Sequence, residues 1–334
     1  MNKINSDKKS CPAKMTTIGG QALIEGIMMR GPERTAVSVR LANGEIDTDF
    51  FETKKISDKI KCLGWPVIRG VVNYVESMKF GYKALMHSAE KAGLEKSDES
   101  DSMRDSDTEQ QNVPEPDEKS SPLFTVLMAV SSVIGVAIAV FLFMALPTFA
   151  FNFLETRFAP IAPFKVFVEG TIKIALFIAY LAAVTLMKDI KRVFMYHGAE
   201  HKAIFCYEYA EELTTENVMK QKRFHPRCGT SFLIIMLLVA IVFEGALIMI
   251  FPVLKTYNIL WILLKIALIL PICGCGYELI KICGRHYNLF TRIISAPGLW
   301  VQRLTTKEPD EKMVEVAITA LKAVIPENPE VDKW

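Results

Sequence analysis

Four long apolar runs dominate the middle of the 334-residue chain, and polar segments separate them. They extend from Leu123 to Phe151, from Val166 to Met187, from Phe232 to Leu254 and from Ile259 to about Cys283. A helix of about 20 apolar residues crosses a hydrocarbon layer of about 30 Å. Lipid offers no partner to backbone polar groups, so each run is expected to be a helix. The pattern predicts an α-helical integral membrane protein with four transmembrane helices in residues 122–284.

Ahead of the first run, the pattern changes to the two-residue alternation that is typical of strands. Residues 35–41 and 45–51 alternate on either side of Asn43 and Gly44, a dipeptide that favours a hairpin turn. Residues 19–26 mix apolar residues with glycine, which predicts a further strand with close backbone contacts. A small β-containing piece is therefore expected before the membrane domain.

A helix completes this soluble α+β piece, which we place at residues 16–92. Apolar side chains recur at helical spacing in residues 65–92, and charged side chains oppose them. Two interpretations of this helix stay open. It lies in the membrane interface, or it packs on the strands.

Polar segments flank these parts of the chain. Residues 1–15 and 93–121 are predicted to be disordered, because the second in particular is rich in Asp, Glu, Ser and Gln and has almost no residues that build a core. Residues 285–326 are expected to form a cytoplasmic interfacial segment and an amphipathic C-terminal helix that ends at Pro326. Residues 327–334 are expected to be a tail.

Basic residues are concentrated in the loop at residues 188–231, between the second and third runs. The loops on the other side carry only Arg157 and Lys165 in one and Lys255 in the other. By the positive-inside rule, the basic loop and both termini lie in the cytoplasm. We therefore expect a multi-pass protein of the cytoplasmic membrane, with the lipid bilayer as its first partner.

Four charged residues interrupt the apolar runs, where a charge is costly. They are Glu169, Lys173, Glu244 and Lys265. Two negative and two positive charges at similar depth predict buried ion pairs between helices. The other interpretation is a proton or ion path, but a four-helix chain without an obvious internal repeat favours the pairs.

Composition and charge narrow the function. The formal net charge is only +2, and no stripe of Lys and Arg interleaves with aromatic residues, so a nucleic acid partner is not expected. The seven cysteines have irregular spacing, which argues against a disulfide framework. Reduced thiols or metal ligands are expected instead.

The basic loop also holds the residues with the most specific chemistry. On a helix, His197 and His201 stand one turn apart on the same face, and Glu200 lies beside them. This order is that of an inverted H-x-x-E-H zinc motif. His225 and Cys228 follow in the same loop and are the nearest further ligands. We predict a divalent metal site, with zinc as the leading candidate, held by the three histidines and Cys228.

The role of Cys228 decides between two kinds of metal site. Four protein ligands close the coordination sphere and make the site structural. If the thiol stays free, the three histidines leave a position for water, and Glu200 is the natural catalytic base. Glu278 is a further candidate carboxylate. An interpretation without metal also stays open, because His and Glu are ordinary residues at a membrane exit. Small residues for helix packing explain Cys273 and Cys275 better than metal does.

Several blocks of the chain resemble the YqhQ-like family of bacterial membrane proteins, known as domain of unknown function 1385. The blocks are residues 19–32, 64–70, 196–208, 225–232, 276–281 and 297–310. The resemblance implies a protein of the bacterial inner membrane and a metal-dependent enzyme. It also implies roles for Gln21, Glu25, Arg30 and Arg69, which the pattern of the chain does not single out.

These observations favour a metal-dependent enzyme, of a hydrolytic kind, that acts at the cytoplasmic face of the membrane on a membrane-proximal substrate. The first alternative is a non-catalytic membrane scaffold or interaction protein with a protein partner, in which the same residues form a structural metal or hydrogen-bond cluster. A small transporter is the less favoured alternative. The metal hypothesis requires the histidine nitrogens to converge within about 4 Å of one point.

Overall fold

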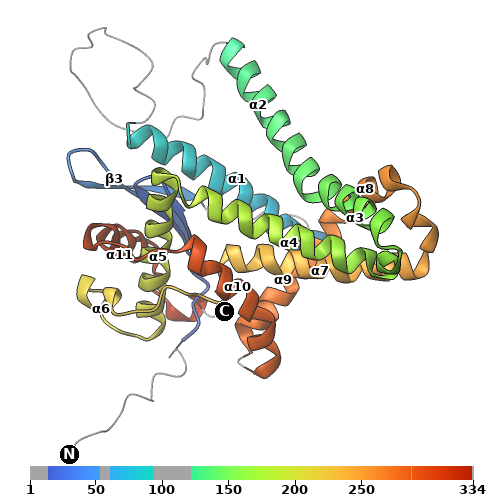
Figure 1. Ribbon diagram of the computed structural model, residues 1–334. Coiled ribbons are helices and arrows are strands. Elements are labelled where there is room, and N and C mark those ends of the chain that lie inside the picture. The colour runs from blue at the N-terminus through green and yellow to red at the C-terminus, as the bar shows by residue number, and fades with distance from the viewer. Residues whose placement is uncertain (1–13, 53–60, 94–121, 287, 333–334) are drawn as a thin grey trace, which may run out of the picture.

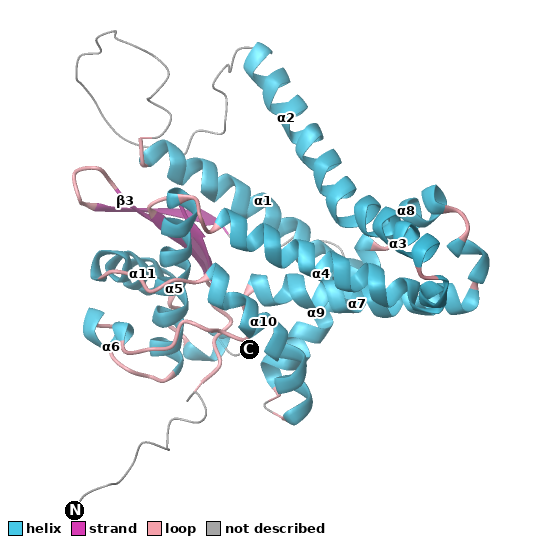
Figure 2. Cartoon of the chain, in the orientation of Figure 1, coloured by secondary structure: helices cyan, strands magenta, loops and turns pink. Residues whose placement is uncertain are grey.

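The computed structural model describes residues 14–52, 61–93, 122–286 and 288–332. A four-stranded sheet with helices on both faces lies beside a bundle of long apolar helices (Figures 1 and 2). The segments predicted to be disordered, 1–15 and 93–121, fall outside the described residues except for 14, 15 and 93.

The sheet is an antiparallel meander in the order β1-β2-β3-β4. Its strands are β1 (Gly19–Leu23), β2 (Gly26–Arg30), β3 (Arg34–Arg40) and β4 (Ile46–Glu52). The predicted hairpin is confirmed, because Arg40 pairs with Ile46 and the turn contains Gly44 at a φ of 90°. The strand expected in residues 19–26 ends at Leu23, where the chain reverses into β2.

Both faces of the sheet are buried by helices. The helices around it are α1 (Ile68–Lys91), α5 (Lys188–Glu208), α6 (Thr215–Met219) and α11 (Glu311–Val324). Successive side chains of a strand point to opposite faces. Ile27 and Met29 accordingly pack with α5 and α11, whereas Met28 packs on the α1 side with Val37. The N-terminal piece, the basic loop and the C-terminal helix therefore share one core.

Helix α1 packs on the strands, which confirms one of the two interpretations of residues 65–92. Its Ala84 is buried against the sheet, and its Gly70 lies against Gly274 of the apolar helix bundle. Apolar side chains that face away from both contacts, such as those of Val75 and Tyr82, are more than half exposed. The position of this exposed side in a membrane interface stays a prediction.

The apolar runs are helices in the structure. They comprise α2 (Pro122–Val140), α3 (Leu146–Arg157), α4 (Lys165–Val184), α7 (Gly229–Ile250), α8 (Asn258–Ala267) and α9 (Ile269–Arg285). Three segments are long and apolar enough to cross a membrane, namely Val130–Arg157, Ala159–Val184 and Gly229–Ile250, and the pair α8 and α9 makes a fourth if it counts as one bent span. That pair is bent by 45°. The bend lies just before Pro271, whose ring excludes the carbonyl four residues earlier and removes a helical hydrogen bond.

The charged residues of the apolar runs are buried and paired, as their balance predicted. Nζ of Lys173 donates to Oε1 of Glu244 at 3.0 Å. Lys265 forms an ion pair with Glu169 and donates to Oγ1 of Thr148 at 2.9 Å. These contacts fix the register between α3, α4, α7 and α8.

The C-terminal part of the chain returns from the apolar bundle to the sheet. Helix α10 (Leu289–Thr305) packs along α7, and α11 begins where the carboxylate of Asp310 accepts a hydrogen bond from the backbone of Met313 at 2.8 Å. The expected tail is part of the fold as far as Asp332, which is buried and accepts hydrogen bonds from Thr16 and Tyr207 at 2.6 and 2.9 Å.

Candidate metal centre

Helix α5 presents the two histidines of the inverted motif on one face, as the helical spacing predicted. The ring centroids of His197 and His201 are 4.4 Å apart. This part of α5 is almost entirely buried, because the sheet, α11 and the segment after α10 pack around it. Gly198 is essential to that packing, since a Cβ there would stand 2.0 Å from the carbonyl oxygen of Lys307.

Backbone carbonyl groups hold both imidazole rings in one orientation. Nδ1 of His197 donates to the carbonyl oxygen of Thr305 at 2.8 Å, and Nδ1 of His201 donates to that of Arg223. A carbonyl oxygen can only accept, so both rings carry their proton on Nδ1 when neutral. Their Nε2 atoms are directed to the other side, towards Cys228, which is the arrangement that outer partners usually impose on metal-binding histidines.

Cys228 completes a group of three ligand atoms. Its Sγ lies 3.1 Å from Nε2 of His197, and the ligand atoms of His197, His201 and Cys228 all lie within 4.8 Å of one another. Ligands of a tetrahedral zinc stand about 3.5 Å apart, given metal–ligand bonds of about 2.0–2.3 Å. The three residues therefore could hold a metal after small movements of their side chains.

The position of Cys228 also favours its thiolate form, which is the form that binds metals. The residue caps α7, and its sulfur accepts a hydrogen bond from the backbone of Thr230 at 3.4 Å. Burial opposes ionisation of the thiol, but the imidazoles of His197 and His201 outweigh it and hold the pKa of Cys228 well below its usual value. Burial likewise opposes a charged imidazole, yet the thiolate raises the pKa of His197 to about 9.

Glu200 is the carboxylate of the site. It is only 4% exposed, and the backbone of Gly20 in β1 donates a hydrogen bond to it. Its Oε2 is buried and has no hydrogen-bond partner within the described part of the chain. Burial raises its pKa, against the opposing effect of His197 and His201. A buried carboxylate oxygen without a partner costs free energy unless a ligand or water satisfies it.

His225, expected as a third histidine ligand, is not a member of this group, although its ring centroid is 5.7 Å from that of His201. Its Nε2 donates to Oε2 of Glu208 at 3.2 Å, and its Nδ1 accepts a hydrogen bond from the backbone of Arg227 at 3.3 Å. Both ring nitrogens are thus engaged. Burial, partly offset by the hydrogen bond to Glu208, lowers the pKa of His225 to about 4, so the ring is neutral and the contact is a hydrogen bond from a neutral donor.

A buried glutamine that the sequence did not single out holds the loop that carries Cys228. Oε1 of Gln302 accepts from the backbone of His225 at 2.8 Å, and its Nε2 donates to the carbonyl of His225 at 2.7 Å and to Oγ of Ser231 at 2.8 Å. In the sequence, the only indication of a role for Gln302 was its position in the block 297–310. The roles of Thr305 and Arg223 could not be predicted, because these residues act through backbone carbonyl groups rather than through their side chains.

The other residues implied by the resemblance connect elements rather than enter the group. Arg69 of α1 binds the carboxylate of Glu278 in α9 through two nitrogens, so Glu278 is engaged away from the candidate ligands. Glu25 binds Arg192 of α5, and Arg30 pairs with Glu76 of α1 at 3.6 Å. Gln21 makes a 3.5 Å contact with the carbonyl of Gly81.

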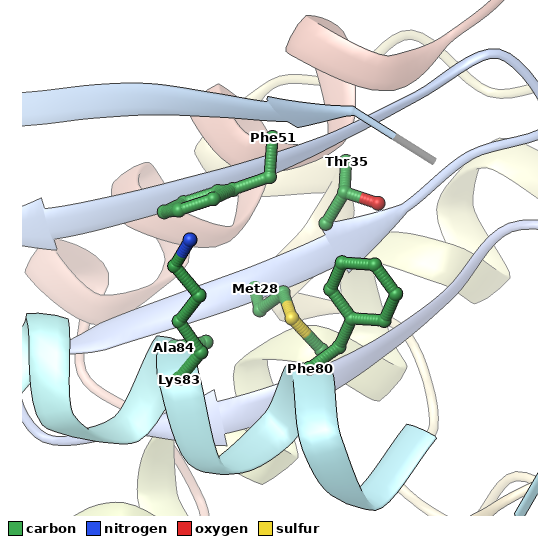
Figure 3. A pocket seen from close by; sticks show the side chains of 6 residues that line it. All are labelled: Met28, Thr35, Phe51, Phe80, Lys83 and Ala84. Carbon is green, nitrogen blue, oxygen red and sulfur yellow. The ribbon is translucent and has the colours of Figure 1, made fainter. Parts of the chain in front are cut away.

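A small hollow between the sheet and α1 offers no alternative site. Figure 3 shows it lined by Met28, Thr35, Phe51, Phe80, Lys83 and Ala84. Its volume is about 10 Å³, which holds at most about one water molecule. The group of three ligands is accordingly the candidate site.

Comparisons with known proteins identify the family of the chain. Residues 65–327 match the family model described as a protein of unknown function (DUF1385). The chain is 32% identical over 313 residues to the "Uncharacterized protein YqhQ" of Bacillus subtilis (strain 168), with 92% of each chain covered. No solved structure matches the chain.

Proposed function

The chain belongs to the DUF1385 family, whose description assigns no activity, and we propose from the geometry of its site that it is a metal-dependent membrane hydrolase. His197, His201 and Cys228 hold a divalent metal, zinc in the first instance. Glu200 acts as the general base. The reaction takes place at the cytoplasmic face of the membrane.

The observation that carries this proposal is the number of converging ligands. Catalytic zinc sites typically use three protein ligands and keep the fourth position for water or substrate, whereas structural sites use four. The group has three members within the described chain, and His225 is engaged elsewhere. Cysteine thiolate and imidazole are a donor set that zinc prefers.

Each residue of the site then has a defined task. A bound divalent metal would polarise a carbonyl or phosphoryl oxygen and lower the pKa of a coordinated water towards 7. The carbonyl groups of Thr305 and Arg223 keep the two imidazoles oriented. The free oxygen of Glu200 accepts the proton of the attacking water, and its raised pKa suits that exchange at neutral pH.

The position of the site in the chain supports an action at the membrane surface. Helix α5 follows the apolar segment that ends at Val184, and Cys228 directly precedes the apolar helix α7. Both sides of the site are thus attached to candidate spans. The basic residues of the loop 188–231 favour its cytoplasmic location by the positive-inside rule.

A structural metal is the second candidate, because the same ligands join α5 to the start of α7. In that case the site stabilises a scaffold, and Glu200 has no catalytic task. Transport receives less support, since the membrane charges that would serve it are paired with each other.

Metal content and hydrolysis separate these possibilities. The protein is purified in detergent from zinc-supplemented cells, metal is measured by mass spectrometry, and hydrolysis of p-nitrophenyl butyrate and bis-p-nitrophenyl phosphate is followed. We expect His197→Ala to lose metal, and His225→Ala to retain it. Glu200→Gln should retain metal but lose activity by about 10²–10⁴-fold, the usual contribution of a general base. Full activity in Glu200→Gln would contradict the catalytic proposal, and wild type without stoichiometric metal would contradict both candidates.

A further inference from the structure

The start of α7 lies directly against the candidate metal centre. Cys228 is the residue that caps this helix, and Gly229 and Thr230 belong to its first turn. Of the three candidate ligands, His201 and Cys228 are buried, and His197 is partly exposed. A group in hydrogen-bond contact with the sulfur of Cys228 can therefore influence how that sulfur binds a metal.

Thr230 makes two contacts with this sulfur. Its backbone nitrogen lies 3.4 Å from Sγ of Cys228, and its hydroxyl oxygen Oγ1 lies 3.2 Å from the same atom. Within the described residues, the hydroxyl has no other hydrogen-bond partner. The sulfur is thus the group that the Thr230 side chain serves.

The thiolate form of Cys228 decides the direction of both hydrogen bonds. A backbone N–H can only donate, and a thiolate carries no proton, so the sulfur accepts from the amide and from the hydroxyl of Thr230. Hydrogen bonds to a charged acceptor are roughly twice as strong as those between neutral groups. The positive end of the α7 dipole acts in the same sense, because it favours a negative charge at the cap.

Two donors on one sulfur affect metal binding in two ways. They hold Sγ in one position, as outer partners do for other metal ligands. They also withdraw part of the charge that the sulfur would donate to a metal, and hydrogen bonds to cysteine sulfur are a general means of tuning metal sites. A sulfur that donates less charge leaves a divalent metal more electrophilic, which suits the proposed hydrolysis.

From these contacts we propose that Thr230 is a positioning residue of the metal centre, whose hydroxyl directs the sulfur of Cys228 and limits the charge that this sulfur donates. This role rests on the proposed function only in its premise that Cys228 binds the metal. It holds for a structural site as well as for a catalytic one. It can therefore be tested without a substrate.

Cobalt substitution tests this role, because cobalt(II) bound by a thiolate has a charge-transfer absorption band that d¹⁰ zinc lacks. The full-length protein is purified in detergent, stripped of metal with a chelator and titrated with cobalt(II) chloride. Thr230→Val keeps the size of the side chain and removes the hydroxyl. We expect its sulfur-to-cobalt band at longer wavelength than in the wild type, because a sulfur with one donor fewer gives up its electrons more easily. Thr230→Ser keeps a hydroxyl and should retain the wild-type band.

Gly229→Ala is the matched control, because Gly229 lies between the ligand and Thr230 and a Cβ there would meet open space. It should leave the band unchanged. A band at the wild-type position in Thr230→Val overturns the role of Thr230, and Thr230→Ala gives the same comparison if Thr230→Val does not fold.

The same spectra separate this proposal from the proposed function. A wild type that binds cobalt without a sulfur band overturns Cys228 as a ligand, and both proposals with it. Full hydrolytic activity in Glu200→Gln, with the band shifted in Thr230→Val, overturns the catalytic proposal and supports the role of Thr230.

Discussion

Two regions of this protein bury charged and polar side chains, and they satisfy them in different ways. In the apolar bundle, two glutamates and two lysines of α4, α7 and α8 form two ion pairs. In the candidate metal centre, backbone carbonyl groups engage one nitrogen of each histidine and leave the other facing Cys228. In the first region, each buried charge is neutralised by an opposite charge of the same bundle. The second is arranged so that three donor atoms converge on a common point, which is the property expected of a ligand site.

The largest expected effect lies in the balanced region. Lys265→Ala leaves Glu169, which is fully buried, without its ion pair. Removing one partner of a buried pair typically costs about 3–5 kcal/mol. We expect a large fall in the thermal unfolding temperature in detergent, with metal content per folded protein unchanged.

A double variant shows whether the fall in unfolding temperature is caused by the unpaired charge of Glu169 or by the lost volume of the Lys265 side chain. Replacing Glu169 and Lys265 together by Leu and Met removes both charges and keeps most of the volume, so the unfolding temperature should recover towards the wild-type value. If Lys265→Ala unfolds like wild type, the two charges do not interact in the protein. The statement that the buried charges of the apolar bundle stabilise each other would then be wrong.

The same contrast explains how much could be predicted from sequence. The apolar runs predicted the helices, because lipid permits no other backbone arrangement. The spacing of His197 and His201 predicted their common face, because helical geometry fixes it. His225 was expected at the metal because it is close in sequence, but its position depends on Glu208 and Gln302, contacts that only the folded chain creates.

Contacts between segments that are far apart in the sequence could not be predicted either. The sheet core uses residues from α5 and α11, which lie far from the strands in sequence. Glu200 accepts a hydrogen bond from the backbone of Gly20, a partner without a side chain. The pattern of side chains along the sequence does not indicate which backbone groups will form hydrogen bonds with a buried side chain.

Removal of the metal should give the next largest effect. A ligand that binds only the folded state stabilises it by about 2.7 kcal/mol at 100 times its dissociation constant, and by about 4.1 at 1,000 times. We therefore expect a chelator to lower the unfolding temperature of the wild type. Cys228→Ala, which already lacks a ligand, should show almost no response, and added zinc should restore only the wild type.

Lys265→Ala is the matched control for this measurement, because it is destabilised without a change to the metal ligands. It should keep its response to the chelator from a lower starting temperature. Equal chelator responses in the wild type and Cys228→Ala would show that metal, if bound, does not use this group.

The smallest effect concerns Gln302, which positions the loop between His225 and Ser231 without touching the three ligands. Gln302→Ala removes three hydrogen bonds. Loss of such an outer partner typically weakens metal binding by about 10–100-fold, so we expect a rise in the zinc dissociation constant of at least about tenfold, or about 1.4 kcal/mol. Gln221→Ala is the control, since Gln221 is a buried glutamine in the same loop that binds Glu211 instead. If both variants bind zinc equally well, Cys228 does not depend on this loop, and the convergence of the ligands has its origin in α5 and the start of α7 alone.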